Sequence, residues 1–463
     1  MKPIRVIELF AGVGGFRLGL EGWEGNSASS GYREKLENAN PYEVVWSNQW
    51  EPNKKLQHAS NVYRNRWLEK GIHKDGDFHE IVENYRHGDI PPHNLMVGGF
   101  PCQDYSVANT LKRAQGIQGK KGVLWWDIYN LLVKLEEKRL APEYLMFENV
   151  DRLINSPRQD RGRDFAIILA CLRDLGYAVE WRIINAADYG MPQRRRRTFI
   201  LGYRKGTEIY SQMKKARERA VTECGVICLA FSARYSETKT FVLDKDIQEL
   251  SNGFSFEHGG KTPFLGAGFM LEGRIWTARV EEALNNIIQP PVVLKDCLEA
   301  QCATSSFRVD DDLVHDSERG WAFHKGPKKR KRKDASTGYE YLWAEGGMPL
   351  TDDLDRPART ILTSEGGASP GRSKHLIKTD GIYRRLTPVE LEKISMFPSN
   401  HTEIGKDPQR GDYRISDSQR AFFMGNALVV GVVERLGYTL AQKIKQGDEK
   451  KMKKSSEVKA KAR

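Results

Sequence analysis

Three short polar segments in the first 200 residues carry side chains suited to covalent and acid–base chemistry. Cys102 follows a proline in a polar loop, Glu148 stands at the end of an apolar run, and residues 194–197 are four arginines. A thiolate adds readily to electron-poor carbon, and a carboxyl group whose pKa is raised by burial can act as a general acid. A buried structural cysteine, a solvated glutamate and a basic surface patch are the alternatives for each segment taken alone.

Two further segments are suited to holding a nucleoside. Gly12, Gly14 and Gly15 follow an apolar run in a G-x-G-G spacing, which differs from the dinucleotide-binding pattern G-x-G-x-x-G. The segment 48–51 reads Asn-Gln-Trp-Glu, in which polar groups can take ribose hydroxyls while the ring of the tryptophan stacks on adenine. The turn at residues 87–90 could hydrogen-bond the edge of that base. A tight turn without a ligand and a buried tryptophan are the plain structural alternatives.

The elements that must position these segments alternate along the chain. Short apolar runs at residues 5–10, 43–47, 95–97, 144–147, 179–184 and 198–201 predict strands, and residues 16–21, 125–135 and 165–175 have helical patterns. Strands separated by helix-length segments predict a doubly wound, parallel α/β sheet. In such a sheet ligands bind beyond the carboxyl ends of the strands, where the segments above lie. In residues 194–197, strand alternation puts Arg195 and Arg197 on one face.

The pattern degrades after residue 204 and returns near residue 380. Residues 1–204 and 380–447 are therefore expected to form one catalytic domain, with residues 205–379 inserted as a smaller domain. Thr387, followed by Pro388 and Glu390, has the spacing of a helix N-cap with a capping box. The lysine-rich residues 448–463 are expected to be a disordered basic tail.

The chain has 463 residues and a net charge of +12, which favours a polyanionic partner such as nucleic acid. Seven cations lie in residues 325–333, a run that suits a non-specific phosphate contact or a flexible loop. No apolar stretch approaches the ~20 residues of a membrane span, so no membrane partner is expected. The six cysteines are sparse, which favours reduced thiols in a cytoplasm. Cys224/Cys228 and Cys297/Cys302 lack metal-binding spacing, so no metal site is expected.

Six motifs in order resemble one family. They are the glycine loop, the Pro-Cys-Gln loop, Glu-Asn-Val at residue 148, Gln-x-Arg-x-Arg at residue 193, Arg-x-Leu-Thr-Pro-x-Glu from residue 384, and Gly-Asn-Ala-Leu from residue 425. Together they resemble the DNA (cytosine-5) methyltransferases of bacterial restriction–modification systems, over the first ~200 residues and again from about 380 to 440. The resemblance implies a Rossmann-like methyltransferase fold that uses S-adenosylmethionine as methyl donor, with no metal.

The resemblance also implies roles for single residues. Cys102 would be the nucleophile, Glu148 and Arg195 would hold the target base, and Arg197 would support the site, with Gln193 ordering its strand. Gln49 stands where the family usually has a glutamate for the ribose, and Glu51 is a possible substitute. The positions expected to contact the cofactor are Phe10, Gly12, Gly14, Gly15, Phe16, Gln49, Trp50, Glu51, Asp89, Ile90, Pro101, Leu124, Asn426, Ala427 and Leu428.

The expected substrate is double-stranded DNA with a short recognition sequence. The family's target-recognition region falls in residues 205–379, and residues 360–367 resemble its glycine-rich core. Residues 106–122 fit the mobile loop that closes over a flipped-out cytosine. The residues expected to contact DNA are Ser106, Gln118, Arg356, Arg359, Thr360 and Arg372.

We expect a cytoplasmic, nucleoid-associated monomer that methylates C5 of cytosine through a covalent adduct of Cys102 with C6, and that pairs functionally with a restriction endonuclease without stable contact. Three alternatives remain at this point. The first is the tRNA-methylating branch of the family, which has a smaller recognition region. The second is a catalytically inactive, sequence-specific DNA-binding protein, and the third is a nucleotide-dependent oxidoreductase, which fits the glycine loop alone.

Overall fold

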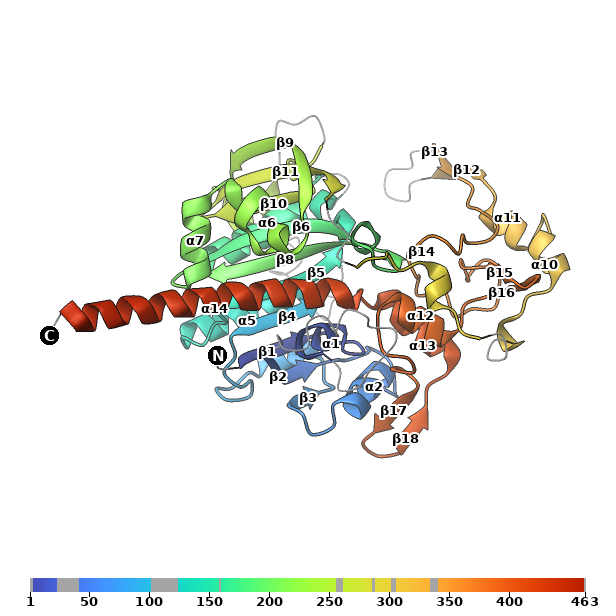
Figure 1. Ribbon diagram of the computed structural model, residues 1–463, viewed down its shortest axis with the longest axis horizontal. Helices are drawn as coiled ribbons and strands as arrows, with labels where there is room; N and C mark the ends of the chain where they lie inside the picture. Colours follow the sequence, from blue (N-terminus) through green and yellow to red (C-terminus); the bar gives the residue numbers. More distant parts are fainter. Residues whose placement is uncertain are drawn as a thin grey trace.

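A computed structural model describes residues 3–22, 41–100, 124–157, 160–254, 261–284, 288–300, 305–333 and 340–461. Its central feature is a ten-stranded sheet with the order β3-β2-β1-β4-β5-β8-β6-β10-β11-β9 (Figure 1). The parallel half contains β3 (Ile72–Lys74), β2 (Tyr42–Asn48), β1 (Ile4–Leu9), β4 (Leu95–Gly99) and β5 (Tyr144–Val150). In the other half β8 (Arg196–Arg204) and β6 (Tyr177–Asn185) pair antiparallel. The predicted α/β fold is confirmed, with a mixed sheet whose first five strands in spatial order are parallel and whose other neighbours pair antiparallel.

Helices cover both faces of this sheet, because the strands of its middle carry apolar side chains on both sides. One face holds α3 (Phe78–Glu83), α5 (Leu124–Glu137) and α6 (Arg163–Asp174). The other face holds α1 (Gly15–Glu21), α7 (Glu208–Ala216), α8 (Val226–Ala230) and the long helix α14 (Val430–Lys461). A Cβ at Gly19 of α1 would lie 2.7 Å from Val433, so the glycine lets α14 pack closely. The C-terminal helix α14 therefore packs into the same apolar core as the N-terminal helix α1.

The expected domain boundary at residue 204 does not coincide with a break in the fold. The strands β9 (Ala233–Val242), β10 (Ala267–Leu271) and β11 (Arg274–Ala283) extend the central sheet, with β10 antiparallel to β6. The sequence pattern degrades here because β10 and β11 form a hairpin and β9 is a polar edge strand, so no helix-length crossover separates them. The part of 205–379 that joins the sheet thus runs to about residue 283.

A smaller body follows and has its own core of Val309, Val314, Trp321, Leu376 and Tyr383. It contains α10 (Asp311–His315), α11 (Trp321–Lys325), the hairpin of β12 (Lys328–Lys333) and β13 (Glu340–Glu345), and the hairpin of β15 (Ile377–Thr379) and β16 (Ile382–Arg384). The short strand β14 (Ala358–Arg359) pairs with β7 (Gln193–Arg194) and joins this body to the sheet-bearing part. We call it the recognition body, because it lies in the segment where the sequence predicts the target-recognition region. Residues 328–333 of the basic run form a strand here, because residues 340–345 supply a pairing partner.

The last segment of the chain returns to the sheet-bearing part, and we call it the return segment. It begins with α12 (Pro388–Ile394), which has the predicted capping box between Thr387 and Glu390. The hairpin of β17 (Ile404–Asp407) and β18 (Gly411–Arg414) and the helix α13 (Asp417–Asn426) follow. The prediction of a disordered tail from residue 448 is wrong for most of its length, because α14 continues to Lys461. The lysines, glutamates and alanines of the tail are good helix formers that extend a helix already anchored in the core. No helix in the described ranges is long and apolar enough to cross a membrane.

Candidate active site

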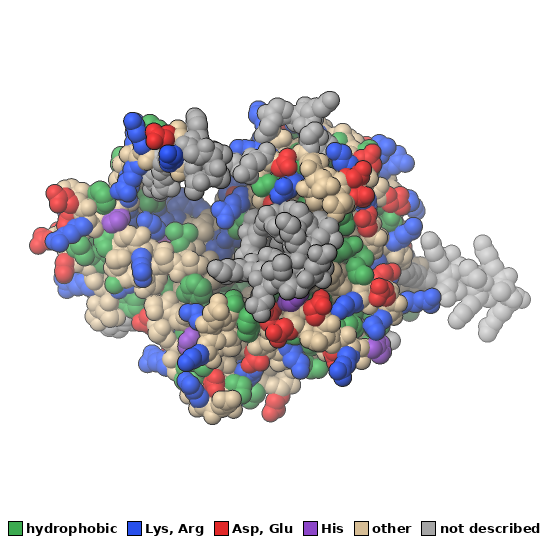
Figure 2. All heavy atoms as spheres, turned by 180° about the vertical axis from the view of Figure 1, so that it is seen from behind, with side chains coloured by type: hydrophobic (Ala, Val, Ile, Leu, Met, Phe, Trp, Pro, Cys, Tyr) green, Lys and Arg blue, Asp and Glu red, His purple; other side chains and the backbone are tan. Residues whose placement is uncertain are grey.

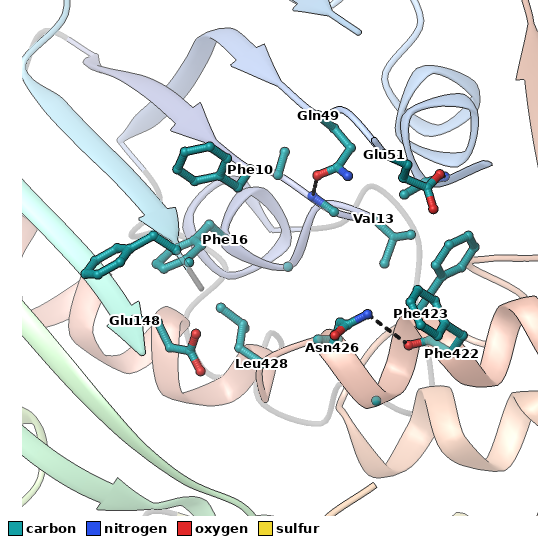
Figure 3. Close-up of a pocket in the computed structure, with 18 of the residues that line it drawn as sticks. Phe10, Val13, Phe16, Gln49, Glu51, Glu148, Phe422, Phe423, Asn426 and Leu428 are labelled. Atoms are coloured by element: carbon teal, nitrogen blue, oxygen red, sulfur yellow. Dashed lines mark hydrogen bonds between the residues drawn. The ribbon is translucent and has the colours of Figure 1, made fainter. Parts of the chain in front are cut away.

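A cavity of about 520 Å³ opens at the carboxyl ends of β1, β2, β4 and β5. Its volume lies in the range of small-molecule sites. The lining comes from the beginning, the middle and the end of the chain, as Figure 3 shows for Gln49, Glu148 and Asn426. The residues that line it are Phe10, Ala11, Gly12, Val13, Gly15, Phe16, Gln49, Trp50, Glu51, Pro52, Lys54, Ala59, Gly99, Phe100, Glu148, Asn149, Val150, Arg195, Arg197, Phe397, Phe422, Phe423, Gly425, Asn426, Ala427 and Leu428.

The glycine loop after β1 forms one wall. Gly12 has a φ of 56° and would meet nothing within 4 Å of an added Cβ, so its face opens onto the cavity. Gly14 has a φ of 87°, and a Cβ there would lie 2.2 Å from the ring of Trp67. Both positions therefore require glycine for conformational or steric reasons. The Gly12 amide donates a 2.7 Å hydrogen bond to Oε1 of Gln49, which ties the loop to the end of β2 (Figure 3).

A buried histidine far along the chain supports the same loop. Nε2 of His401 lies 2.7 Å from the carbonyl oxygen of Val13, so this nitrogen carries the hydrogen and donates it. Burial, together with the charge of Arg66, lowers the pKa of His401 to about 3, which keeps the ring neutral. Phe397 and Trp67 pack against the ring. No spacing rule in the sequence pointed to His401, because its partner is a backbone carbonyl 388 residues away.

The end of β2 contributes an aromatic and an acid. The Trp50 side chain is 37% exposed, so its ring is available to a ligand. Glu51 accepts a 3.0 Å hydrogen bond from the Ala59 amide through Oε2, and the Gln57 side chain holds the Glu51 backbone. Gln49 and Glu51, the two candidates for binding the ribose, therefore differ in their hydrogen bonds. The amide oxygen of Gln49 accepts from the Gly12 amide of the glycine loop, whereas the Glu51 carboxylate accepts from the Ala59 amide.

The charged wall of the cavity is built by β5 and β8. Glu148 Oε1 forms an ion pair with Nε of Arg197 at 2.8 Å, and both side chains are largely buried. Desolvation raises the pKa of Glu148, while the charges of Arg197 and Arg195 oppose that rise. In Figure 3 the Glu148 carboxylate lies beside Leu428, and both residues line the cavity. The acid and the glycine loop thus share one cavity.

Arg195 lies deeper than Arg197 and joins distant segments. Its guanidinium donates to the carbonyl oxygens of Ile361 at 3.4 Å and Gly425 at 3.1 Å. Its buried Nε has no hydrogen-bond partner among the described residues. Burial and the like charge of Arg197 lower the pKa of Arg195 to about 9. The predicted alternation holds, because Arg194 and Arg196 are exposed.

Two amides brace this wall. Nδ2 of Asn149 donates a 2.7 Å hydrogen bond to the carbonyl oxygen of Phe100, the last described residue before the segment that holds Cys102. Nε2 of Gln193 donates to Oγ of Ser395 at 3.2 Å, which ties β7 to the turn after α12. The sequence singled out Gln193 for this ordering role and gave none to Asn149.

The cavity brings together most of the predicted cofactor and catalytic residues, and four positions differ. Gly14, Asp89, Ile90 and Leu124 do not line it. Gly14 serves the turn itself, Asp89 accepts a 2.6 Å hydrogen bond from the Arg86 amide, and Ile90 is buried in the core with α5. Four predicted residues lie outside the described ranges, and they are Pro101, Cys102, Ser106 and Gln118.

Aromatic residues near the C-terminal motif were missed from the sequence. Phe397, Phe422 and Phe423 line the cavity beside Asn426. The signal for the latter two was their place just before Gly-Asn-Ala-Leu. Phe422 is 39% exposed, so part of its ring remains accessible.

The residues predicted to contact DNA fall into two groups. Arg359 is mostly buried and pairs with Asp352 at 2.5 Å, and Oγ1 of Thr360 donates to the carbonyl oxygen of Arg194 at 2.5 Å. These two side chains therefore hold the recognition body together and join it to the cavity. Arg356 and Arg372 are exposed. In the described part of the chain no group of three or more His, Cys, Asp or Glu side chains could hold a metal ion.

Comparisons with known proteins identify the family that this fold and site belong to. Residues 4–442 match the family model described as C-5 cytosine-specific DNA methylase, so the chain belongs to that family and is a DNA (cytosine-5) methyltransferase. It is 40% identical to the type II methyltransferase M.Sau3AI of Staphylococcus aureus, over 94% of this chain and 95% of that protein. It is also 32% identical over 45% of its length to the type II methyltransferase M.HhaI of Haemophilus parahaemolyticus, of which 52% is covered.

Solved structures support the fold. The Dnmt2 methyltransferase of S. pombe aligns with a TM-score of 0.51 at 15% identity, covering 96% of this chain and 99% of that one. The Entamoeba histolytica methyltransferase EhMeth aligns with a TM-score of 0.50 over 96% of this chain and 99% of its own. The family model and the type II relatives favour DNA methylation over the three alternatives raised from the sequence.

Proposed function

We propose that this enzyme transfers the methyl group of S-adenosylmethionine to C5 of a flipped-out cytosine in a short duplex sequence, and thereby protects host DNA in the cytoplasm from a cognate endonuclease. One observation carries the proposal. The Glu148–Arg197 pair and Arg195 line the same cavity as the glycine loop and Trp50, so a base and a methyl donor can meet there.

The residues present fit the cofactor. The open face at Gly12, the exposed ring of Trp50 and the apolar floor of Phe16 and Leu428 suit a nucleoside and a methionine chain. When bound, S-adenosylmethionine supplies an electrophilic methyl group. Phe10, Gly12, Gly15, Phe16, Trp50, Asn426, Ala427 and Leu428 would hold it.

The remaining chemistry belongs to the chain. Cytosine C5 is a poor nucleophile, and addition of the Cys102 thiolate to C6 places electron density on C5. Proton donation from Glu148 to N3, and the Arg195 guanidinium near O2, stabilise the charge that develops on the ring. After C5 takes the methyl group, loss of the C5 proton to a base, which can be water, expels the thiolate, and N3 returns its proton to Glu148.

Incubation with labelled S-adenosylmethionine and either duplex DNA or tRNA tests the proposal. We expect label in DNA alone. The Cys102→Ser variant should lose methylation and keep DNA binding. Bisulfite sequencing of DNA from cells that express the protein then gives the recognition sequence and the methylated cytosine. Folded wild-type protein that labels neither nucleic acid would contradict the enzymatic assignment, and a fully active Cys102→Ser variant would contradict the mechanism.

We also infer that Glu51, rather than Gln49, binds the ribose hydroxyls. The amide oxygen of Gln49 accepts from Gly12, whereas Glu51 has one oxygen on the Ala59 amide and lines the cavity. Calorimetry with S-adenosylhomocysteine tests this inference. Glu51→Gln should weaken binding about tenfold, the size of one charged hydrogen bond. The same variant should bind the 2′,3′-dideoxy analogue as wild type does, and an equal loss for both ligands would refute the assignment.

A further inference from the structure

The hairpin of β12 and β13 carries an uncompensated block of positive charge. All six residues of β12 are Lys or Arg. The two acids of β13 pair in register with the two ends of β12, Lys328 with Glu345 and Lys333 with Glu340. Between these ends, Lys329 pairs with Ala344 and Lys331 pairs with Leu342. Neither of these two lysines therefore has an acid opposite it on the paired strand.

This charge is open to solvent. Lys329, Arg330, Lys331 and Lys333 are exposed, and Leu342 on the facing strand is 63% exposed. An isolated two-stranded hairpin is marginally stable, and adjacent like charges weaken it further. A polyanion laid along β12 would remove that repulsion. The surface thus fits a ligand that carries regularly spaced negative charge.

The root of the hairpin is fixed to the recognition body. Nζ of Lys325 is buried, 3.4 Å from Oδ2 of Asp352, and donates to the carbonyl oxygen of Leu350 at 2.8 Å. Asp352 also binds Arg359 at 2.5 Å and the Leu376 amide at 3.0 Å. Lys325 therefore anchors the run and is not available to a ligand.

The same contacts lead from the hairpin to the cavity. Arg359 pairs with Arg194 in the β14–β7 ladder, and the next residue, Arg195, lines the cavity. In Figure 1 the hairpin stands beyond α11, across a gap from the outer strands of the large sheet. Figure 2 shows Lys and Arg side chains in the hollow between the two parts of the molecule. The hairpin thus lies at the edge of the surface that a substrate at the cavity would follow.

We propose that the β12–β13 hairpin is a sequence-independent arm that grips the phosphates of duplex DNA beside the recognition sequence; this rests on the proposed function. Six residues of strand span about 20 Å, close to six base pairs. Lys329, Lys331 and Lys333 repeat every two residues, about 6.6 Å, which is roughly twice the axial spacing of phosphates along one strand. Contacts to phosphates carry no sequence information, so the arm adds affinity without selecting sequence.

Binding of duplexes of two lengths tests the arm. The triple variant Lys329→Gln, Lys331→Gln, Lys333→Gln removes three exposed charges. The matched control is Lys205→Gln, Lys214→Gln, Lys215→Gln, which removes three exposed charges at α7 and in the turn just before it. The helix α7 lies away from the hairpin in Figure 1. Fluorescence titration of full-length proteins would use a 30-base-pair duplex and a duplex that ends at the recognition sequence, between 50 and 200 mM KCl.

On the long duplex, the triple variant should bind about tenfold more weakly at 100 mM salt, with a salt slope lower by two to three. On the short duplex it should match wild type, and bisulfite sequencing should give an unchanged target. The control should match wild type on both. An equal loss of affinity for both duplexes, or a changed target sequence, would overturn the proposal. A loss of affinity that is confined to RNA, whether single-stranded or duplex, would also overturn it.

Two further results keep this test separate from the proposed function. Unchanged binding of S-adenosylhomocysteine by the triple variant shows that it is folded. A wild-type protein that methylates no DNA would contradict the proposed function. A wild-type protein that methylates DNA, with a triple variant that behaves as the control does, would contradict the arm alone.

Discussion

Glu148 and Arg197 form an ion pair across two antiparallel strands, with Oε1 of the acid 2.8 Å from Nε of the arginine. In the β5–β8 ladder Arg197 lies opposite Val150, so its side chain reaches diagonally to Glu148, two residues back. Glu148 is therefore held at the end of β5 by the neighbouring strand. The ion pair fixes the direction of the Glu148 carboxyl group, which lines the cavity.

Replacing the acid should stop catalysis without unfolding the protein. Glu148→Gln keeps the shape of the side chain and removes the proton that the mechanism gives to N3. We expect the single-turnover methylation rate to fall by about 10² to 10⁴, the usual contribution of a general acid. The control is Asp151→Asn, whose exposed partner Arg196 lies 3.2 Å away, and which should change the rate less than twofold. A Glu148→Gln rate within threefold of wild type would remove Glu148 from the mechanism.

The pH dependence of the rate should depend on Arg197. Desolvation raises the pKa of Glu148 and the Arg197 charge opposes that rise, so removing the charge should raise the pKa further. The protonated acid is lost as pH rises through this pKa. In Arg197→Gln the alkaline fall of the single-turnover rate should therefore move to higher pH, at a lower maximal rate. Rate profiles of the two proteins between pH 5 and 9 measure the shift, and a fall at lower pH in the variant would contradict it.

A second buried pair should control the stability of the recognition body. Nδ1 of His375 lies 3.0 Å from Oε1 of Glu365, and both side chains are buried. Burial alone would lower the pKa of His375, but the Glu365 carboxylate more than offsets this and the pKa is raised. Burial would raise the pKa of Glu365, but the His375 charge and the hydrogen bonds to this carboxylate lower it to about 2.

The sign of the effect follows from these two shifts. The stabilisation linked to His375 is fully present below its unfolded pKa near 6.5 and is lost as pH rises through the raised folded value. The stabilisation linked to Glu365 is present above about 4.5 and is lost as pH falls toward 2. Glu365→Gln should therefore cost about 3–5 kcal/mol, most between pH 4.5 and 6.5. Urea denaturation from pH 4 to 8 measures this, and a difference that grows steadily above pH 7 would argue against the pair.

The sequence could predict those features that depend on neighbouring residues. The glycine turn, the capping box at Thr387 and the inward face of Arg195 and Arg197 each depend on a few consecutive positions. Local pattern was also sufficient for β1, β2, β4 and β5, whereas the three-residue edge strand β3 was missed. The six ordered motifs then indicated the family.

The features that the sequence could not predict depend on partners far along the chain. The strands β9 to β11 join the sheet through β6, and their polar, hairpin-linked pattern resembles an insert when it is considered alone. The tail is helical because α14 is anchored by α1 at the other end of the chain. Arg359 was predicted to contact DNA because it is a cation in the right segment, and only the fold shows that Asp352 occupies it.

His401 is another long-range feature, and it gives the last prediction. Its Nε2 hydrogen is the link between the return segment and the Val13 carbonyl in the glycine loop. His401→Phe keeps an aromatic ring against Phe397 and Trp67 and removes the donor. Loss of one buried hydrogen bond of about 1 kcal/mol should weaken S-adenosylhomocysteine binding about fivefold, and DNA affinity should not change. The control is His315→Phe, an exposed site in the recognition body, which should bind both ligands as wild type does. Calorimetry with S-adenosylhomocysteine and with DNA measures both affinities. Unchanged affinity of His401→Phe for S-adenosylhomocysteine would show that His401 contributes packing alone.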